Sequence, residues 1–137
     1  MAAYTIRYDV DATFEEAVAA TQDALADEGF GVLCDIDVQA TLREKLDADF
    51  RQYRILGACN PPLAHEGMSA ELELGALLPC NVIVFETDEG GVGVSAVDPR
   101  VLLSVVPNDD LDPVAESVAE SMETALQSLP GAESAAE

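Results

Sequence analysis

Apolar and polar residues alternate in some segments of the chain and recur at helical spacing in others. Alternation is typical of a strand with one buried face, whereas apolar residues three and four positions apart are typical of an amphipathic helix. The pattern predicts five strands, over 4–8, 30–38, 50–59, 77–86 and 92–97. It also predicts two long helices, over 14–28 and 112–129, and shorter helical turns over 41–46, 62–68 and 98–104.

Local signals mark the ends of the two long helices. Thr13 and Glu16 form a capping box, and Gly29 ends the first helix. The second begins at the Asp-Pro pair 112–113, and Pro130 ends it. The resulting order, strand-helix-four strands-helix, predicts an α+β fold with a mostly antiparallel sheet and both main helices packed on one face.

Finer expectations concern single strands and the chain end. Pro79 interrupts the strand 77–86 and predicts an edge or a bulge there. Residues 1–130 are predicted to form a single domain, followed by a flexible acidic tail over 131–137. In the strand 30–38, one face is predicted to carry Phe30, Val32, Cys34, Ile36 and Val38.

Charge narrows the choice of partners. The chain has 27 acidic and 6 basic residues, a formal net charge of −21, and its acidic residues occur in every segment. Nucleic acids and anionic membranes bind basic surfaces, so neither is predicted as a partner. An acidic coat with Lys45 as the only lysine is typical of salt-in halophilic archaea, in which molar salt screens the repulsion. The alternative is an ordinary acidic protein, whose fold should not loosen as salt is removed.

The chain is predicted to be cytoplasmic. No stretch approaches the ~20 apolar residues of a membrane helix, and the start of the chain lacks the basic and apolar blocks of a signal peptide. Three cysteines without a C-x-x-C pair predict neither structural disulfides nor a zinc ribbon nor a thioredoxin-type motif.

The stretch 53–81 holds the main candidate chemistry. Two Cys-Asn pairs, 59–60 and 80–81, close apolar runs, and each pair touches a proline. The only histidine lies between them. If the two strands are neighbours, their ends bring the pairs together around a pocket. The predicted ligand-binding residues are Tyr53, Arg54, Cys59, Asn60, His65, Cys80 and Asn81.

The two Cys-Asn pairs and the histidine do not decide whether the site holds a cofactor. Two thiolates and an imidazole, from Cys59, His65 and Cys80, suit zinc or another soft transition metal. Their C-x5-H-x14-C spacing matches no established metal motif, and free cysteines are often small core residues. Alternatively, Cys59 near a helix start with His65 as base suits a thiol enzyme or a sulfur carrier. No acidic residue is placed to orient that base, which disfavours catalysis.

Basic residues are concentrated in one segment. Arg43, Lys45, Arg51 and Arg54 are four of the six cations in the chain. Arg43, Lys45 and Arg51 are predicted to bind an anion such as a phosphate, a carboxylate ligand or an acidic partner segment. The alternative is that they balance the neighbouring aspartates and glutamates.

Three strings carry a resemblance to a known family. They are GFGVLCDIDVQATLREKL from Gly29, YRILGACNPPLAH from Tyr53 and LGALLPCNVIVFE from Leu74. Together they resemble the family called domain of unknown function 302 over 4–129. The resemblance implies a fold similar to one half of the TATA-binding protein and assembly as a homodimer. It implies neither DNA binding nor an established biochemical role, and Cys34 and the acidic surface depart from the family pattern.

Three functional hypotheses follow. The favoured one is a ligand- or metal-binding module whose pocket lies at the two Cys-Asn pairs, near a dimer interface. The second is a thiol-dependent enzyme or sulfur carrier. The third is a structural or regulatory homodimer without chemistry, in which the two pairs only shape the core.

Overall fold

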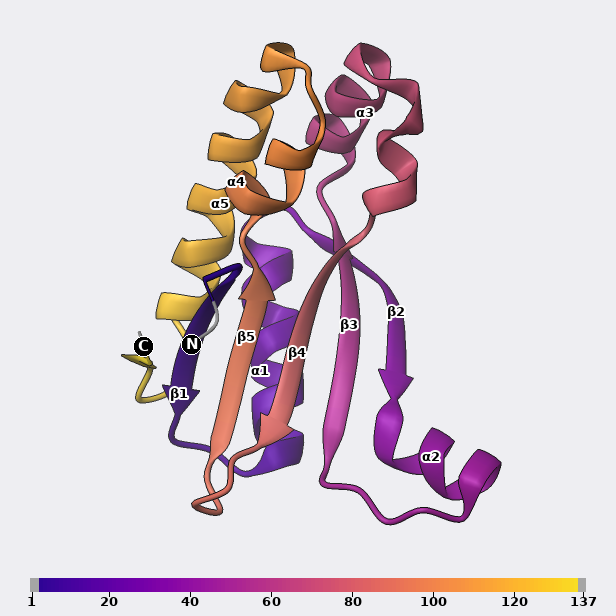
Figure 1. Ribbon diagram of the computed structural model, residues 1–137. Helices are drawn as coiled ribbons and strands as arrows, with labels where there is room; N and C mark the ends of the chain where they lie inside the picture. Colours follow the sequence, from indigo (N-terminus) through magenta and orange to yellow (C-terminus); the bar gives the residue numbers. More distant parts are fainter. Residues whose placement is uncertain (1–2, 136–137) are drawn as a thin grey trace.

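A six-stranded antiparallel sheet forms the centre of the molecule, with strands in the order β2-β3-β4-β5-β1-β6 (Figure 1). The computed structural model describes residues 3–135. Its strands are β1 (Thr5–Val10), β2 (Gly31–Asp37), β3 (Tyr53–Cys59), β4 (Cys80–Glu86), β5 (Val92–Val97) and β6 (Glu133–Ser134). The predicted α+β class and antiparallel sheet are confirmed.

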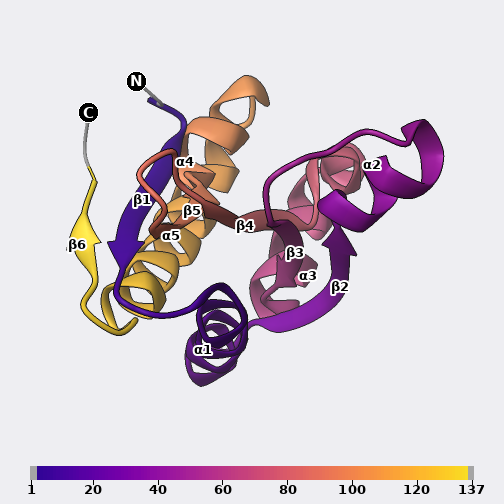
Figure 2. The same cartoon turned by 90° about the horizontal axis from the view of Figure 1, so that it is seen from below.

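Two long helices, α1 (Phe14–Asp27) and α5 (Asp112–Gln127), cover one face of the sheet (Figures 1 and 2). The capping box of α1 forms as predicted: the Thr13 hydroxyl accepts from the Glu16 N–H at 3.2 Å, and the Glu16 carboxylate accepts from the Thr13 N–H at 3.0 Å. The apolar stripes of both helices pack on alternate side chains of the central strands, including Leu56, Val82, Val84 and Val94. This layer is the main core, and the opposite face of the sheet carries no long helix.

Short helices gather at the end of the sheet where β3 ends and β4 begins, at the top of Figure 1. They are α3 (Pro61–Ala70), α4 (Pro99–Leu102) and the 3₁₀ turns η1 (Leu72–Leu77), η2 (Leu103–Val105) and η3 (Asp109–Leu111). A second, smaller core joins them through the buried side chains of Leu74, Leu103, Leu111 and Ala115. At the other end of the sheet, α2 (Val38–Leu46) continues from β2 and buries none of its residues.

A β-bulge between Val32 and Cys34 changes the faces of β2. Val32 pairs with Ala58, a core residue, whereas Cys34 pairs with Gly57, which faces away from the helices. One extra residue in a strand inverts the alternation beyond it. The prediction of a single buried face along this strand is therefore wrong beyond the bulge, where Ile36 is 44% exposed.

Pro79 does not mark an edge strand or a bulge, so that prediction is wrong. The residue comes directly before β4, which lies between β3 and β5. A proline is tolerated there because the hydrogen-bonded ladder begins only at Cys80. Its ring packs over Gly57 on the face opposite the helices.

Part of the predicted flexible tail over 131–137 is paired with the sheet. Glu133 and Ser134 form β6 and pair with Asp9 and Tyr8 of β1, so backbone hydrogen bonding holds this part of the chain against the sheet. Residues 136–137 of the predicted tail lie outside the described residues.

Within residues 3–135, no helix has both the length and the apolar character that a membrane crossing requires. The cytoplasmic location stays a prediction, as does the halophilic origin that the acidic surface suggests.

Candidate functional site

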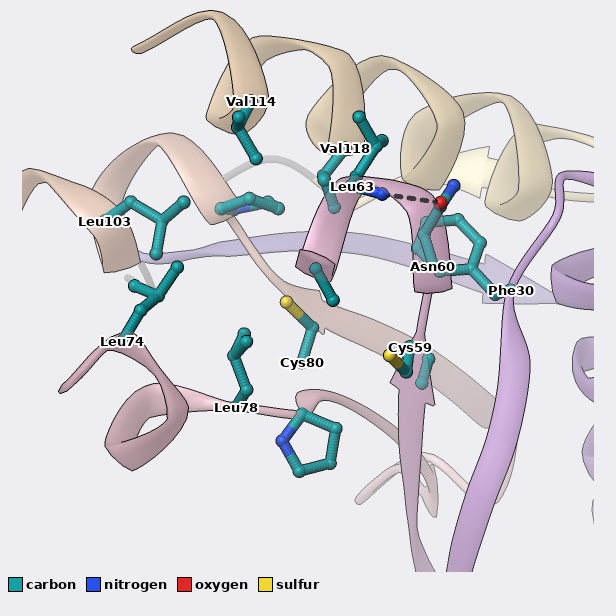
Figure 3. Close-up of a pocket in the computed structure, with 14 residues that line it drawn as sticks. Phe30, Cys59, Asn60, Leu63, Leu74, Leu78, Cys80, Leu103, Val114 and Val118 are labelled. Atoms are coloured by element: carbon teal, nitrogen blue, oxygen red, sulfur yellow. Dashed lines mark hydrogen bonds between the residues drawn. The ribbon is translucent and has the colours of Figure 1, made fainter. Parts of the chain in front are cut away.

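An apolar cavity of about 40 Å³ lies between the ends of β3 and β4 and the surrounding helices (Figure 3). Its wall combines side chains from the sheet, from α3 and η1, and from α5. Both cysteines of the predicted signature, Cys59 and Cys80, belong to this wall, together with Asn60. The remaining wall is mainly aliphatic and aromatic, and includes Phe30, Leu63, Leu74, Leu78, Leu103 and Val118.

The first Cys-Asn pair lies at a transition from strand to helix. Cys59 is the last residue of β3, and Asn60 is the N-cap of α3, where its side-chain oxygen accepts from the Leu63 N–H at 3.3 Å. Asparagine favours this position because it satisfies a backbone N–H that has no partner in the helix. Pro61 follows at the first helical position, where a missing N–H costs nothing. The sequence Cys-Asn-Pro therefore ends the strand and starts α3 against the cavity.

The second pair begins β4, and only its cysteine faces the cavity. Cys80 lies opposite Ala58 in the ladder and is 7% exposed. Burial, together with a smaller effect of the nearby Cys59, raises the pKa of its thiol to about 11. Because the thiolate is the nucleophile, Cys80 is a poor nucleophile near neutral pH. Cys59, by contrast, is half-buried.

The structure brings together only part of the predicted ligand-binding set. Asn81 is exposed and pairs with Gly57, so it faces away from the cavity. His65 is exposed on α3 and is absent from the cavity wall. Tyr53 and Arg54 begin β3, at the end of the strand far from Cys59. Of the seven predicted ligand-binding residues, only Cys59, Asn60 and Cys80 share the cavity.

The predicted three-residue metal site does not form. His65 is exposed, whereas Cys80 is buried. In the part of the chain that the structure describes, no three side chains of histidine, cysteine, aspartate or glutamate lie close enough to hold a metal ion. The arrangement offers no set of ligands for zinc, which binds through four ligands in structural sites and three in catalytic sites.

The arginines of the predicted anion site already have carboxylate partners. Arg43 contacts Asp49 beside a surface hollow next to α2. Arg51 donates to Asp88 at 2.7 Å and to the backbone oxygen of Glu86 at 2.9 Å. This pairing favours the alternative that the cations balance neighbouring acids.

Arg54 and Lys45 complete the basic cluster. Arg54 donates to both carboxylate oxygens of Asp35, at 3.0 and 3.1 Å, in a bidentate pair that fixes its guanidinium beside α1. Lys45 is exposed on α2. The four residues are spread over α2, the following segment and β3, so they do not surround one pocket.

Sequence reasoning missed two features. The first is the aliphatic wall of the cavity, to which segments 62–78 and 99–105 contribute alongside α5. The apolar residues of these two segments lie outside the long helices and were the available signal. The second feature is a row of three aromatic rings. The centre of the Tyr53 ring lies 5.8 Å from that of Phe50 and 6.0 Å from that of Phe85. The guanidinium carbon of Arg7 lies 5.1 Å from the centre of the Phe85 ring.

The chain is a small α+β domain in which two helices cover one face of an antiparallel sheet. The chain belongs to the family described as domain of unknown function DUF302, whose model matches residues 6–129. It is similar to the crystal structure of an uncharacterized conserved DUF302 protein from Bacillus stearothermophilus. That comparison has 27% sequence identity, a TM-score of 0.86, and coverage of 91% of this chain and 97% of the other. Comparison with curated proteins gives no match.

Proposed function

We propose that the protein is a binding module for a small apolar molecule, or for the apolar end of a larger one, held in the cavity beside Cys59 and Cys80. The observation that carries this proposal is the composition of the cavity wall. Its polar side chains are few, and the oxygen of Asn60 is already used to cap α3. A ligand with many polar groups would therefore lose hydrogen bonds to water without replacement.

The size of the cavity limits what it holds. A volume of about 40 Å³ leaves room for a small guest only, and the apolar wall favours an apolar guest over a polar one. An engineered cavity that binds benzene measures ~150 Å³. The present cavity therefore suits a xenon atom or a short alkyl group, and a longer ligand would extend outward past α3.

Binding is favoured over thiol catalysis for two reasons. The high pKa of Cys80 keeps this thiol protonated near neutral pH. The only histidine, which would have served as base, is exposed and absent from the cavity wall. No general base is therefore placed beside the thiols within residues 3–135.

Replacing Ala64 by leucine is expected to fill the cavity and weaken xenon binding by at least about tenfold, which corresponds to about 1.4 kcal/mol. Ala64 is half-buried and part of the wall, so the larger side chain occupies the space of the guest. Xenon titration followed by NMR of the labelled Leu63 and Leu74 methyl groups measures the affinity. The matched control is Ala70→Leu, on the exposed end of the same helix. Absence of saturable xenon binding in the unmodified protein, or equal binding in both variants, contradicts the proposal.

A second candidate role is a homodimer assembled through the β2–α2 arm, defined as residues 31–52. Four large apolar side chains of this arm are exposed: Leu33 at 67%, Ile36 at 44%, Leu46 at 70% and Phe50 at 42%. None of the residues of α2 is buried, although its sequence is not uniformly polar. Apolar groups gathered on one protruding segment are typical of an interaction surface. This supports the dimer that the family resemblance implies.

Replacing Leu46 by aspartate is expected to halve the mass measured by light scattering in molar KCl, because a buried unpaired carboxylate opposes association. The control is Leu72→Asp, which changes an 85% exposed leucine outside the arm and should leave the mass unchanged. A monomeric unmodified protein, or a dimer that survives Leu46→Asp, rules out this arrangement.

A further inference from the structure

Two cysteines lie close together on the neighbouring strands β3 and β4, and both line the cavity. Ala58 lies directly opposite Cys80, and Cys59 is the next residue along β3. Opposite Cα atoms are ~4.5–5.5 Å apart and one strand step is ~3.3 Å, so the two cysteine Cα atoms are roughly 6 Å apart. Disulfides span Cα separations of about 4.4–6.8 Å. The backbone spacing therefore permits a bond between Cys59 and Cys80.

Cys59 is paired with Gly31 of β2 at the end of β3, and it lines the cavity together with Cys80. Inside a regular strand, neighbouring side chains point to opposite faces, which would separate Cys59 from Cys80. Cys59 is the last residue of β3, and the chain turns into α3 directly after it. Both cysteines line the same cavity, and Figure 3 shows both sulfurs along its β3–β4 wall. Formation of the bond then requires rotation of both side chains toward each other.

The two thiols also differ in accessibility. A thiol–disulfide exchange needs one thiol that the reagent can reach first and a second thiol nearby that then displaces it. Cys59 is half-buried and therefore partly open to a small reagent, whereas Cys80 is buried. The charge of Cys59 affects the titration of Cys80, which places the two groups within electrostatic reach of each other. The third cysteine, Cys34, is exposed on β2 and lies over Gly57, outside the cavity wall.

We propose that Cys59 and Cys80 form a dithiol pair that small disulfides oxidise to an intramolecular disulfide, and that this bond closes the cavity to its guest. The closing of the cavity rests on the proposed function, whereas the formation of the disulfide does not. Low-molecular-weight disulfides are the oxidant that the reaction requires.

The reaction proceeds in two exchanges. The Cys59 thiolate attacks one sulfur of the small disulfide, the S–S bond of the reagent breaks, and one small thiol leaves. The Cys80 thiol loses its proton to solvent, and its thiolate attacks the Cys59 sulfur and releases the second small thiol. Two protein thiols are oxidised and one small disulfide is reduced to two thiols. Because only the thiolate attacks, the second exchange should accelerate about tenfold per pH unit between pH 7 and 10.

The bond would change the cavity because of where it lies. Cys59 precedes α3 by one capping residue, and Cys80 is the first residue of β4. Joining them ties the start of α3 to the sheet and places two bonded sulfurs in the wall of a cavity of only about 40 Å³. The oxidised protein should therefore bind xenon at least about tenfold more weakly than the reduced protein.

The test uses the full chain with Cys34→Ser, which removes the exposed thiol that would otherwise exchange first. The protein is incubated in molar KCl with hydroxyethyl disulfide, a neutral reagent that the acidic surface does not repel. The expected product has lost about 2 Da, two hydrogen atoms, and a crosslinked peptide joins Cys59 to Cys80. Adding Cys80→Ala should stop the reaction at a mixed disulfide on Cys59.

The outcomes separate this inference from the proposed function. A parent protein that stops at the mixed disulfide, or that does not react, overturns the dithiol pair, whatever its xenon affinity. A parent protein that forms the crosslink but binds xenon equally well in both redox states overturns the closing of the cavity. Xenon binding by the reduced protein alone tests the proposed function. If Cys80→Ala perturbs the fold, Cys59→Ala provides the second control, which should not acquire an adduct at Cys80 near neutral pH.

Discussion

Replacing Leu126 by alanine is expected to lower the free energy of unfolding by about 2–5 kcal/mol. Leu126 is fully buried near the end of α5 and belongs to the main core between that helix and the sheet. Truncation removes apolar contacts and leaves a cavity that the neighbouring side chains fill only in part. Since a domain of this size is stable by ~5–15 kcal/mol, the loss is a large part of the total. Urea unfolding followed by circular dichroism, in constant molar KCl, measures it.

Leu72→Ala is the matched control for this experiment. Leu72 is 85% exposed in η1, so the same truncation should change the free energy of unfolding by less than about 0.5 kcal/mol. Both variants are compared at one salt concentration, because screening of the acidic surface contributes to stability separately. Similar losses in the two variants would show that the α5–sheet layer is not the main core.

Replacing Gly57 by alanine is expected to destabilise the fold by about 1–3 kcal/mol through overpacking. A Cβ atom at this position would lie 2.6 Å from the Cys34 sulfur and 2.9 Å from a ring carbon of Pro79. The cysteine side chain rotates away at little cost, but the proline ring is fixed by its own backbone. Urea unfolding measures the loss, and the change should also disturb the start of β4 at Cys80.

A double substitution separates the two clashes. Gly57→Ala combined with Cys34→Ala should recover only part of the stability, because Pro79 still opposes the new methyl group. Gly31→Ala is the control in the neighbouring strand, where the nearest atom to a new Cβ is 3.9 Å away. This control should be close to neutral, since the restricted unfolded chain offsets small losses. If the double variant recovered all of the lost stability, Pro79 would not contribute to the destabilisation.

The long helices were predictable because their signals are local. The capping box at Thr13 needs only neighbouring residues and forms as the sequence indicated. The start of α5 is placed correctly by the Asp-Pro pair, but the N-cap is Leu111 rather than Asp112, and no side chain caps this helix. The bulge in β2 was not predictable, because alternation continues through the sequence on both sides of it. Only the pairing with β3 shows that Cys34 lies opposite Gly57 rather than over the core.

The candidate site was predictable only where neighbouring strands determined it. Because β3 and β4 are antiparallel neighbours, the end of one meets the start of the other, and this brings Cys59 near Cys80. Asn81 follows Cys80 in the same strand and must point to the opposite face, which alternation alone would have revealed. The position of His65 depended on the rotation of α3 about its axis. The cavity itself joins residues from 30 to 118 and has no local signal.

The bulged outer strand β2 has a consequence for solubility during synthesis and storage. An edge strand presents unpaired backbone groups that recruit strands from other molecules and start aggregates. Here the bulge interrupts the regular repeat of those groups, and Asp37 adds a carboxylate at the end of the same strand. A strand from a second molecule that tried to extend the sheet here would meet an irregular hydrogen-bonding pattern, whereas side-chain contacts through the β2–α2 arm need no such pairing. The irregularity that inverts the faces of β2 therefore also protects the open end of the sheet from unintended polymerisation.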